Sequence, residues 1–177
     1  GVDVTVYLNQ YGFASDPTTQ TVTTDASGYA EFDQLVINEA AEGYQLLFDA
    51  GYSGVVNVSS NAFNVVNAPV DHLTNLVDPE DTESGATIGG PPSVTALDTF
   101  GNPVQGVTIS VSETGGYAFD GGATSATTDE NGIASFDDLI INSTGQYSLT
   151  YSTTGVSDIV SSTFNVMSGT VSYRFEG

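Results

Sequence analysis

The sequence predicts an all-β protein, and three observations support this. Thr, Ser, Val and Gly are abundant while Lys and Arg together number 1, so strand-forming residues outnumber good helix formers. No long window places apolar residues at the i, i+3, i+4, i+7 spacing of an amphipathic helix. A stretch that begins at Asp25 returns 104 positions later at Asp129, with eight of fourteen residues identical. A repeat of this period indicates an array of like units.

Each copy of the repeated stretch reads as a turn followed by an extended segment. An Asp and a Gly form the turn, where Gly is free to adopt a positive φ. The step from Phe to Leu within the segment is three residues rather than two, which predicts a bulge or bend. The residues expected to point inward are Ala30, Phe32, Leu35 and Ile37 in the first copy and Ala134, Phe136, Leu139 and Ile141 in the second.

The remaining elements of the first unit follow in order as short alternating segments separated by polar turns. Strands are expected at Val2 to Leu8, at Thr21 to Thr24, at Tyr44 to Phe48 and, as the last strand, at Val56 to Val65. Short strands with turns every 8–12 residues are typical of a sandwich. We expect Phe32, Phe63, Phe136 and Phe164 to lie in the cores.

The second unit repeats this order and adds a leading part. Val70 to Val77 and Pro91 to Asp98 supply two extra strands at the front, for which the first unit has no counterpart. After Val166 the chain continues into Thr170 to Glu176, an alternating strand with no sandwich of its own. Its apolar residues are Val171, Tyr173 and Phe175.

The segments Val94 to Val107 and Thr128 to Ile141 carry a specific pattern. They read Val-x-x-x-Asp-x-x-Gly-Asn-Pro-Val-x-Gly-Val and Thr-x-x-x-Gly-x-Ala-x-Phe-x-x-Leu-x-Ile. This resembles the bacterial immunoglobulin-like (Big-type) tandem repeats of large cell-surface proteins. The resemblance implies two tandem immunoglobulin-like sandwiches in an extracellular or cell-surface protein. The expected divisions are an incomplete sandwich over 1–68, a complete one over 69–167 and a C-terminal strand over 168–177.

The charge excludes some partners. Asp and Glu number 22 against one basic residue, Arg174, for a formal net charge of −21. Such a surface repels nucleic acid and anionic membranes, and no run of 18 apolar residues predicts a membrane span. The acidity fits a solvated surface that resists aggregation, carboxylate clusters neutralised by Ca²⁺, or a saline habitat.

Catalytic chemistry is not predicted. His72 is the only imidazole and there is no Cys, so neither a catalytic triad nor a zinc site built on these residues can be assembled within one chain. Carboxylates are too widespread for any pair to stand out as a glycosidase site. We therefore expect a protein that is not an enzyme and has no cofactor other than, at most, Ca²⁺.

The sequence contains candidate sites for calcium binding and for glycosylation. Clustered carboxylates make a calcium site conceivable at Asp78, Glu80, Asp81 and Glu83, and at Asp129 and Glu130, although the EF-hand spacing is absent. Exposed loop carboxylates without an ion are the simpler interpretation. Asn57-Val-Ser and Asn142-Ser-Thr match the glycosylation pattern Asn-x-Ser/Thr.

Two functional classes follow. One is a structural subunit or segment of an extracellular filament or stalk, in which Val171, Tyr173 and Phe175 complete the first unit of the next subunit by strand donation, or join a flanking repeat of the same chain. The other is an adhesin module that binds a sugar or protein through its loops, with Tyr11–Phe13 and Tyr117–Phe119 as candidates. The equivalent positions of these two loops favour the structural class.

Overall fold

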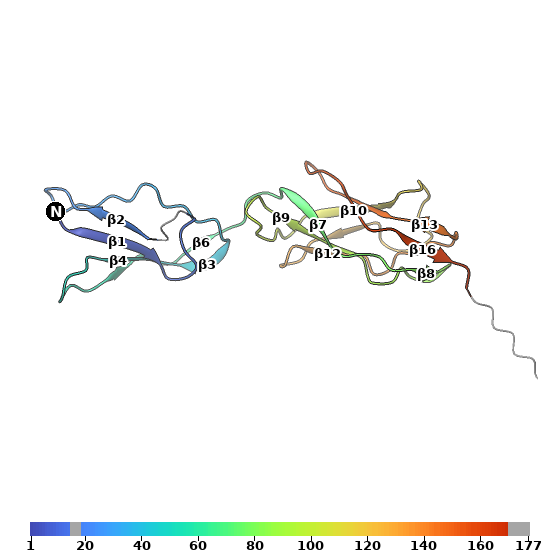
Figure 1. Ribbon diagram of the computed structural model, residues 1–177, viewed down its shortest axis with the longest axis horizontal. Coiled ribbons are helices and arrows are strands. Elements are labelled where there is room, and N and C mark those ends of the chain that lie inside the picture. The colour runs from blue at the N-terminus through green and yellow to red at the C-terminus, as the bar shows by residue number, and fades with distance from the viewer. Residues whose placement is uncertain (15–18, 170–177) are drawn as a thin grey trace, which may run out of the picture. The chain divides into compact units, whose positions relative to one another are not determined.

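The computed structural model describes residues 1–14 and 19–169, and the chain divides into two compact units, Gly1–Asn67 and a second that begins at Ala68 (Figure 1). All regular elements in the described residues are β-strands, which confirms the all-β prediction. No helix long and apolar enough to cross a membrane occurs in this described part of the chain. The tail residues Val171, Tyr173 and Phe175 lie outside the described residues.

The first unit is built on one antiparallel four-stranded sheet in the order β2-β1-β4-β5, with a separate pair β3-β6. Its core contains Val6, Leu8, Phe13 and Tyr44. Alternation along β1 places Val6 in this core, and Val6 lies opposite Phe48 of β4. The strand bounds are β1 Asp3–Leu8, β2 Gln20–Thr23, β3 Ala41–Tyr44, β4 Leu46–Asp49, β5 Val58–Ser59 and β6 Phe63–Val65.

The second unit has three sheets, in the orders β11-β10-β14-β15, β12-β9-β7 and β13-β16-β8. Its core is much larger and includes Val94, Ile109, Phe136, Tyr151 and Phe164. The strand bounds are β7 His72–Val77, β8 Thr82–Glu83, β9 Ser93–Leu97, β10 Thr108–Glu113, β11 Ser125–Thr127, β12 Ile133–Ser135, β13 Gly145–Tyr147, β14 Leu149–Ser152, β15 Ile159–Val160 and β16 Phe164–Met167.

The sheet orders show which parts of the two units correspond. The sheet β2-β1-β4-β5 repeats as β11-β10-β14-β15, and the pair β3-β6 repeats as β13-β16. Within the described residues, the first unit has no counterpart of β7, β8 or β9. The counterpart of β12 would be residues 29–31, which form no strand here. A strand needs a partner for its backbone groups, and β12 has β9 as its partner.

Several sequence expectations are confirmed and two are wrong. Strands β7 and β9 form at the front of the second unit as predicted, and the chain bends at Asp138 between Phe136 and Leu139. The predicted single strand at Val56 to Val65 is instead two strands, β5 and β6, which belong to different sheets. Phe63 is not a core residue, because 36% of its surface is exposed.

Candidate functional site

The described part of the first unit has an open core where the second unit has a closed one. Phe164 and Phe136 are each 1% exposed. Their counterparts Phe63 and Phe32 are exposed and half-buried, respectively. The same difference holds for Leu139, which is fully buried, and Leu35, which is not. The second unit has the further sheet β12-β9-β7 and the strand β8, and in the described residues of the first unit β7, β8 and β9 have no counterpart.

Two equivalent glycines show how much space is left open. A Cβ placed on Gly132 would lie 2.8 Å from the Ala96 carbonyl oxygen and 3.0 Å from the Pro103 side chain. A Cβ placed on Gly28 would meet nothing within 4 Å. Both glycines have a positive φ, +71° and +82°, so the backbone turn itself is the same. The difference is therefore what packs against the turn, not the turn.

The aspartate turn beside this space is formed in both units. Asp25 Oδ1 accepts hydrogen bonds from Ser27 N at 2.8 Å and Tyr29 N at 2.9 Å. Asp129 Oδ1 accepts from Asn131 N and Ile133 N, both at 2.9 Å. The pKa of Asp129 lies below its usual value, mainly because of the hydrogen bond from Ile133 N; burial has a smaller, opposite effect. The turn therefore forms without a partner strand. The segment that follows it, residues 29–31, is in no strand and is free to pair with an added one.

A depression lies next to this turn in the first unit. Its volume is about 700 Å³ and its lining is mainly apolar. Thr24 Oγ1 in its wall accepts a hydrogen bond from Val2 N at 2.8 Å. The equivalent Thr128 accepts from Val107 N at 2.9 Å and also donates to the Val104 carbonyl at 2.7 Å. The residues that line the depression are Val2, Thr24, Gly28, Ala50, Tyr52, Ser53 and Val55.

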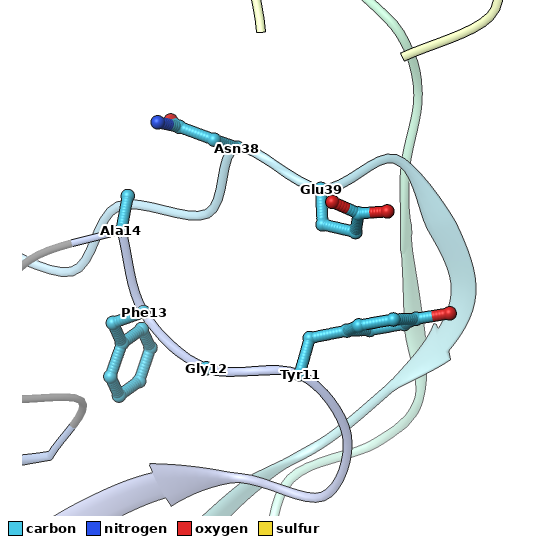
Figure 2. A pocket seen from close by; sticks show the side chains of 6 residues that line it. All are labelled: Tyr11, Gly12, Phe13, Ala14, Asn38 and Glu39. Carbon is cyan, nitrogen blue, oxygen red and sulfur yellow. The ribbon is translucent and has the colours of Figure 1, made fainter. Parts of the chain in front are cut away.

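A second pocket lies in the loop after β1 (Figure 2). Tyr11 has a φ of +54°, which is unusual for a residue with a side chain, and the residue is 69% exposed. The ring centroid lies 6.0 Å from that of Tyr44, whose hydroxyl donates to the Glu39 carbonyl at 2.8 Å. Burial of Tyr44, together with the charges of Glu39 and Tyr11, raises the pKa of Tyr44. The pocket is about 390 Å³ and is lined by Tyr11, Gly12, Phe13, Ala14, Asn38 and Glu39.

The aromatic loops named from the sequence occupy equivalent positions in the two units. Tyr11 and Tyr117 are 69% and 70% exposed, while Phe13 is buried and Phe119 packs against the core of the second unit. One aromatic residue of each loop therefore anchors it and the other faces solvent. In the second unit the carboxylate of Glu113 fixes the loop by accepting hydrogen bonds from the backbone amides of Gly115 and Tyr117.

The structure does not bring the predicted calcium ligands together. Asp78 Oδ1 accepts from Ser162 N, in the connection between β15 and β16, at 3.0 Å. Asp81 Oδ1 accepts from Asn165 N, in β16, at 2.7 Å, so the two carboxylates are held by different backbone groups. Glu80, Glu83 and Glu130 are exposed. Across residues 1–14 and 19–169, no group of three or more His, Cys, Asp or Glu side chains is arranged to hold a metal ion. Calcium binding stays a prediction.

Both candidate glycosylation sites are on the surface. Asn57 is exposed just before β5, and its Nδ2 lies 3.4 Å from the hydroxyl of Tyr7. Asn142 is exposed in a loop, and its backbone N donates to Asp120 at 2.7 Å. His72, the single imidazole, begins β7 and lies 3.1 Å from the Asp71 carboxylate.

Sequence reasoning missed a buried carboxylate. Asp98 is fully buried and accepts hydrogen bonds at 2.9 Å from the backbone amides of Ala68, Phe100 and Asn102 and from the Asn102 side chain. Burial opposes its ionisation, but these donors prevail and lower the pKa of Asp98. The signal available in the sequence was the turn Asp98-Thr-Phe-Gly-Asn102, in which one carboxylate faces several amides.

Comparison with known proteins finds similar solved structures, whereas no protein-family model and no curated protein matches the chain. The D0-D1 domain of Intimin is 15% identical with a TM-score of 0.45, and the match covers 94% of this chain and 82% of that one. Invasin, described as a bacterial integrin-binding protein, is 17% identical with a TM-score of 0.40, over 96% of this chain and 32% of that one. A glycosyl hydrolase family 2 member from Bacteroides cellulosilyticus is 14% identical with a TM-score of 0.41, over 93% and 21%.

The fold is immunoglobulin-like. This is the fold that the resemblance to tandem bacterial repeats predicts, and it rests on the strand orders of the two units, β2-β1-β4-β5 with β3-β6 and β11-β10-β14-β15 with β13-β16. At these identities the likeness concerns the fold, and no activity, substrate or partner passes from those proteins to this chain.

Proposed function

We propose that the chain is a structural subunit or segment of an extracellular filament or cell-surface stalk, and that it assembles head to tail. The observation that carries this proposal is the difference between the two cores. Phe63 is 36% exposed where the equivalent Phe164 is 1% exposed. Open sheet edges and exposed apolar residues promote association, so the first unit is suited to receive a further strand.

The C-terminal tail has the sequence of such a strand. Val171, Tyr173 and Phe175 alternate with polar residues, which is the pattern of a strand that buries one face. In strand addition, main-chain hydrogen bonds provide affinity and alternate side chains fill pockets. Because the donating and receiving surfaces differ, each subunit receives one strand and offers another, and the contact propagates into a filament unless it closes into a ring.

Removal of the tail tests this function. Deletion of residues 169–177 is expected to leave monomers that no longer polymerise, and a peptide of that sequence is expected to cap filaments of the intact chain. A matched variant replaces Val171, Tyr173 and Phe175 by Ser, which retains the length of the tail and removes its apolar face. Light scattering and electron microscopy provide the measurement. Filaments that form normally from both variants would show that the tail is not the donor.

The pocket at Tyr11 favours a second function, that of an adhesin module. An exposed aromatic ring beside a carboxylate and an amide is suited to bind a sugar, and a strained backbone is often associated with function. The expected loss of sugar or protein binding is tested with Tyr11→Asn, because Asn tolerates a positive φ. Tyr117→Asn in the equivalent loop is the control. A glycan array on which the Tyr11 variant binds as strongly as the intact chain excludes this site.

A further inference from the structure

We infer that the donated strand enters the first unit antiparallel to residues 29–31, at the place that β9 holds in the second unit. This inference rests on the proposed function and specifies its acceptor site. In the second unit, Ser135, Ala134 and Ile133 of β12 lie opposite Ser93, Val94 and Thr95 of β9. The repeat of 104 residues transfers these three acceptor positions to Glu31, Ala30 and Tyr29.

The uncovered space at Gly28, next to residues 29–31, indicates where the inward side chains of the donated strand fit. In the second unit the Gly132 turn is covered by Ala96 of β9 and by Pro103. In the first unit Gly28 is uncovered and forms part of the 700 Å³ depression. A strand that arrives here without a second covering segment must therefore carry a larger residue than Ala96 at the position facing Gly28.

The tail meets this requirement in one register. The inward residues of the second unit's leading segment are Pro92, Val94 and Ala96, all fully buried and spaced by two. Val171, Tyr173 and Phe175 have the same spacing. Matching the two series in order places Phe175 at the position of Ala96, where its ring extends into the depression, and Tyr173 opposite Ala30.

Charge favours this register over the one that is shifted by two residues and brings Val171 opposite Ala30. It places Arg174, the one basic residue of a chain with formal charge −21, on the outer face opposite Tyr29. Tyr29 is 64% exposed, and Glu31, two residues further along the same segment, is also exposed. Arg174 would there combine a cation–π contact with attraction to a carboxylate. A register shifted by two residues, with Val171 opposite Ala30, moves Arg174 beyond Tyr29 and loses this pair.

Engineered cysteine pairs test the register, because the chain contains no Cys. Opposed strand positions place Cα atoms about 4.5–5.5 Å apart, within the range that a disulfide spans. The double variant Glu31→Cys/Ser172→Cys of the 177-residue chain is expected to form a ladder of disulfide-linked multimers on a non-reducing gel. The control Glu31→Cys/Thr170→Cys, which samples the shifted register, is expected to form at least tenfold fewer.

The outcomes separate this inference from the proposed function. A ladder from the Glu31→Cys/Thr170→Cys variant alone overturns the inferred register. Cross-links confined to monomers overturn the exchange of the strand between chains. No cross-link in either variant, while the tail deletion still prevents assembly, overturns this acceptor edge and leaves strand donation standing. Normal assembly without the tail removes the proposed function itself.

A pair of glycine substitutions tests the acceptor site without cysteines. Gly28 and Gly155 have φ values of +82° and +81°, and a Cβ at either would meet nothing within 4 Å. Asn tolerates this backbone, so Gly28→Asn and Gly155→Asn are expected to fold alike. Only Gly28→Asn places a side chain where Phe175 is expected to pack. We expect at least tenfold slower assembly by light scattering for Gly28→Asn and an unchanged rate for Gly155→Asn; equal rates overturn the placement.

Discussion

Truncation of two equivalent phenylalanines, Phe164→Ala and Phe63→Ala, measures how open the first core is. Removal of a fully buried Phe side chain costs about 3–5 kcal/mol, because burial is lost and a cavity forms. Phe164 is 1% exposed, so we expect the full cost. Phe63 is 36% exposed and contacts Tyr44 on one side, with ring centroids 5.9 Å apart. About a third of its burial is already missing, and water can fill the space that it leaves, so we expect a cost of about 2 kcal/mol.

Scanning calorimetry of monomeric chains is the assay. In a unit of this size, 1 kcal/mol corresponds to about 4–8 °C in Tm, so Phe164→Ala is expected to lower the Tm of the second unit by at least about 12 °C. Phe63→Ala is expected to lower that of the first by about half as much. In assembled material the effect of Phe63→Ala is expected to grow, because the added strand completes the burial. Equal losses for the two variants in monomers would refute the reasoning from the open core.

Four further predictions concern single features. Asp98→Asn is expected to destabilise the second unit by about 3 kcal/mol, because the backbone amides lose a charged acceptor. The folded pKa of Asp98 is depressed, so its contribution to stability is fully present above the unfolded pKa of about 3.9 and is lost as the pH falls through the lowered folded value. A series of Tm measurements against pH tests this. Tyr151→Phe is expected to stabilise by about 1 kcal/mol in denaturant titrations, because within the described structure its buried hydroxyl has no hydrogen-bond partner and the equivalent residue is Phe48. If calcium is bound, chelation lowers Tm and added Ca²⁺ restores it more than a monovalent salt of equal ionic strength. If Asn142 carries a glycan, Asn142→Gln reduces the intact mass of the protein by that of the glycan.

The fold was largely predictable because its signals are local and repeated. The alternation of apolar and polar residues predicts β1 and β10. Asp25 and Asp129 each begin a turn, which their side chains hold through hydrogen bonds that span only a few positions. The error at Phe63 has a different origin. Its sequence context matches that of Phe164, yet burial depends on strands elsewhere in the chain, and the described first unit has no counterpart of them.

The candidate sites were less predictable for the same reason. Four carboxylates between Asp78 and Glu83 are close in sequence, but Asp78 and Asp81 are drawn to separate backbone amides, at Ser162 and Asn165. The importance of Gly28 appears only when its surroundings are compared with those of Gly132. Proximity in sequence therefore gave little information about a site, whereas comparison of equivalent positions in the two units indicated the uncovered turn at Gly28.

The acidity of the chain gains a physical role under the proposed assembly. A subunit with an open core is prone to non-specific association, and a formal charge of −21 opposes it through mutual repulsion. The same repulsion opposes head-to-tail contact, except where Arg174 is expected to meet the acidic edge at Glu31. Salt screens the general repulsion over a Debye length of about 10 Å at 0.1 M, while a desolvated pair is screened much less. Assembly by strand donation should therefore accelerate as salt rises, and Arg174→Gln should slow it at every salt concentration.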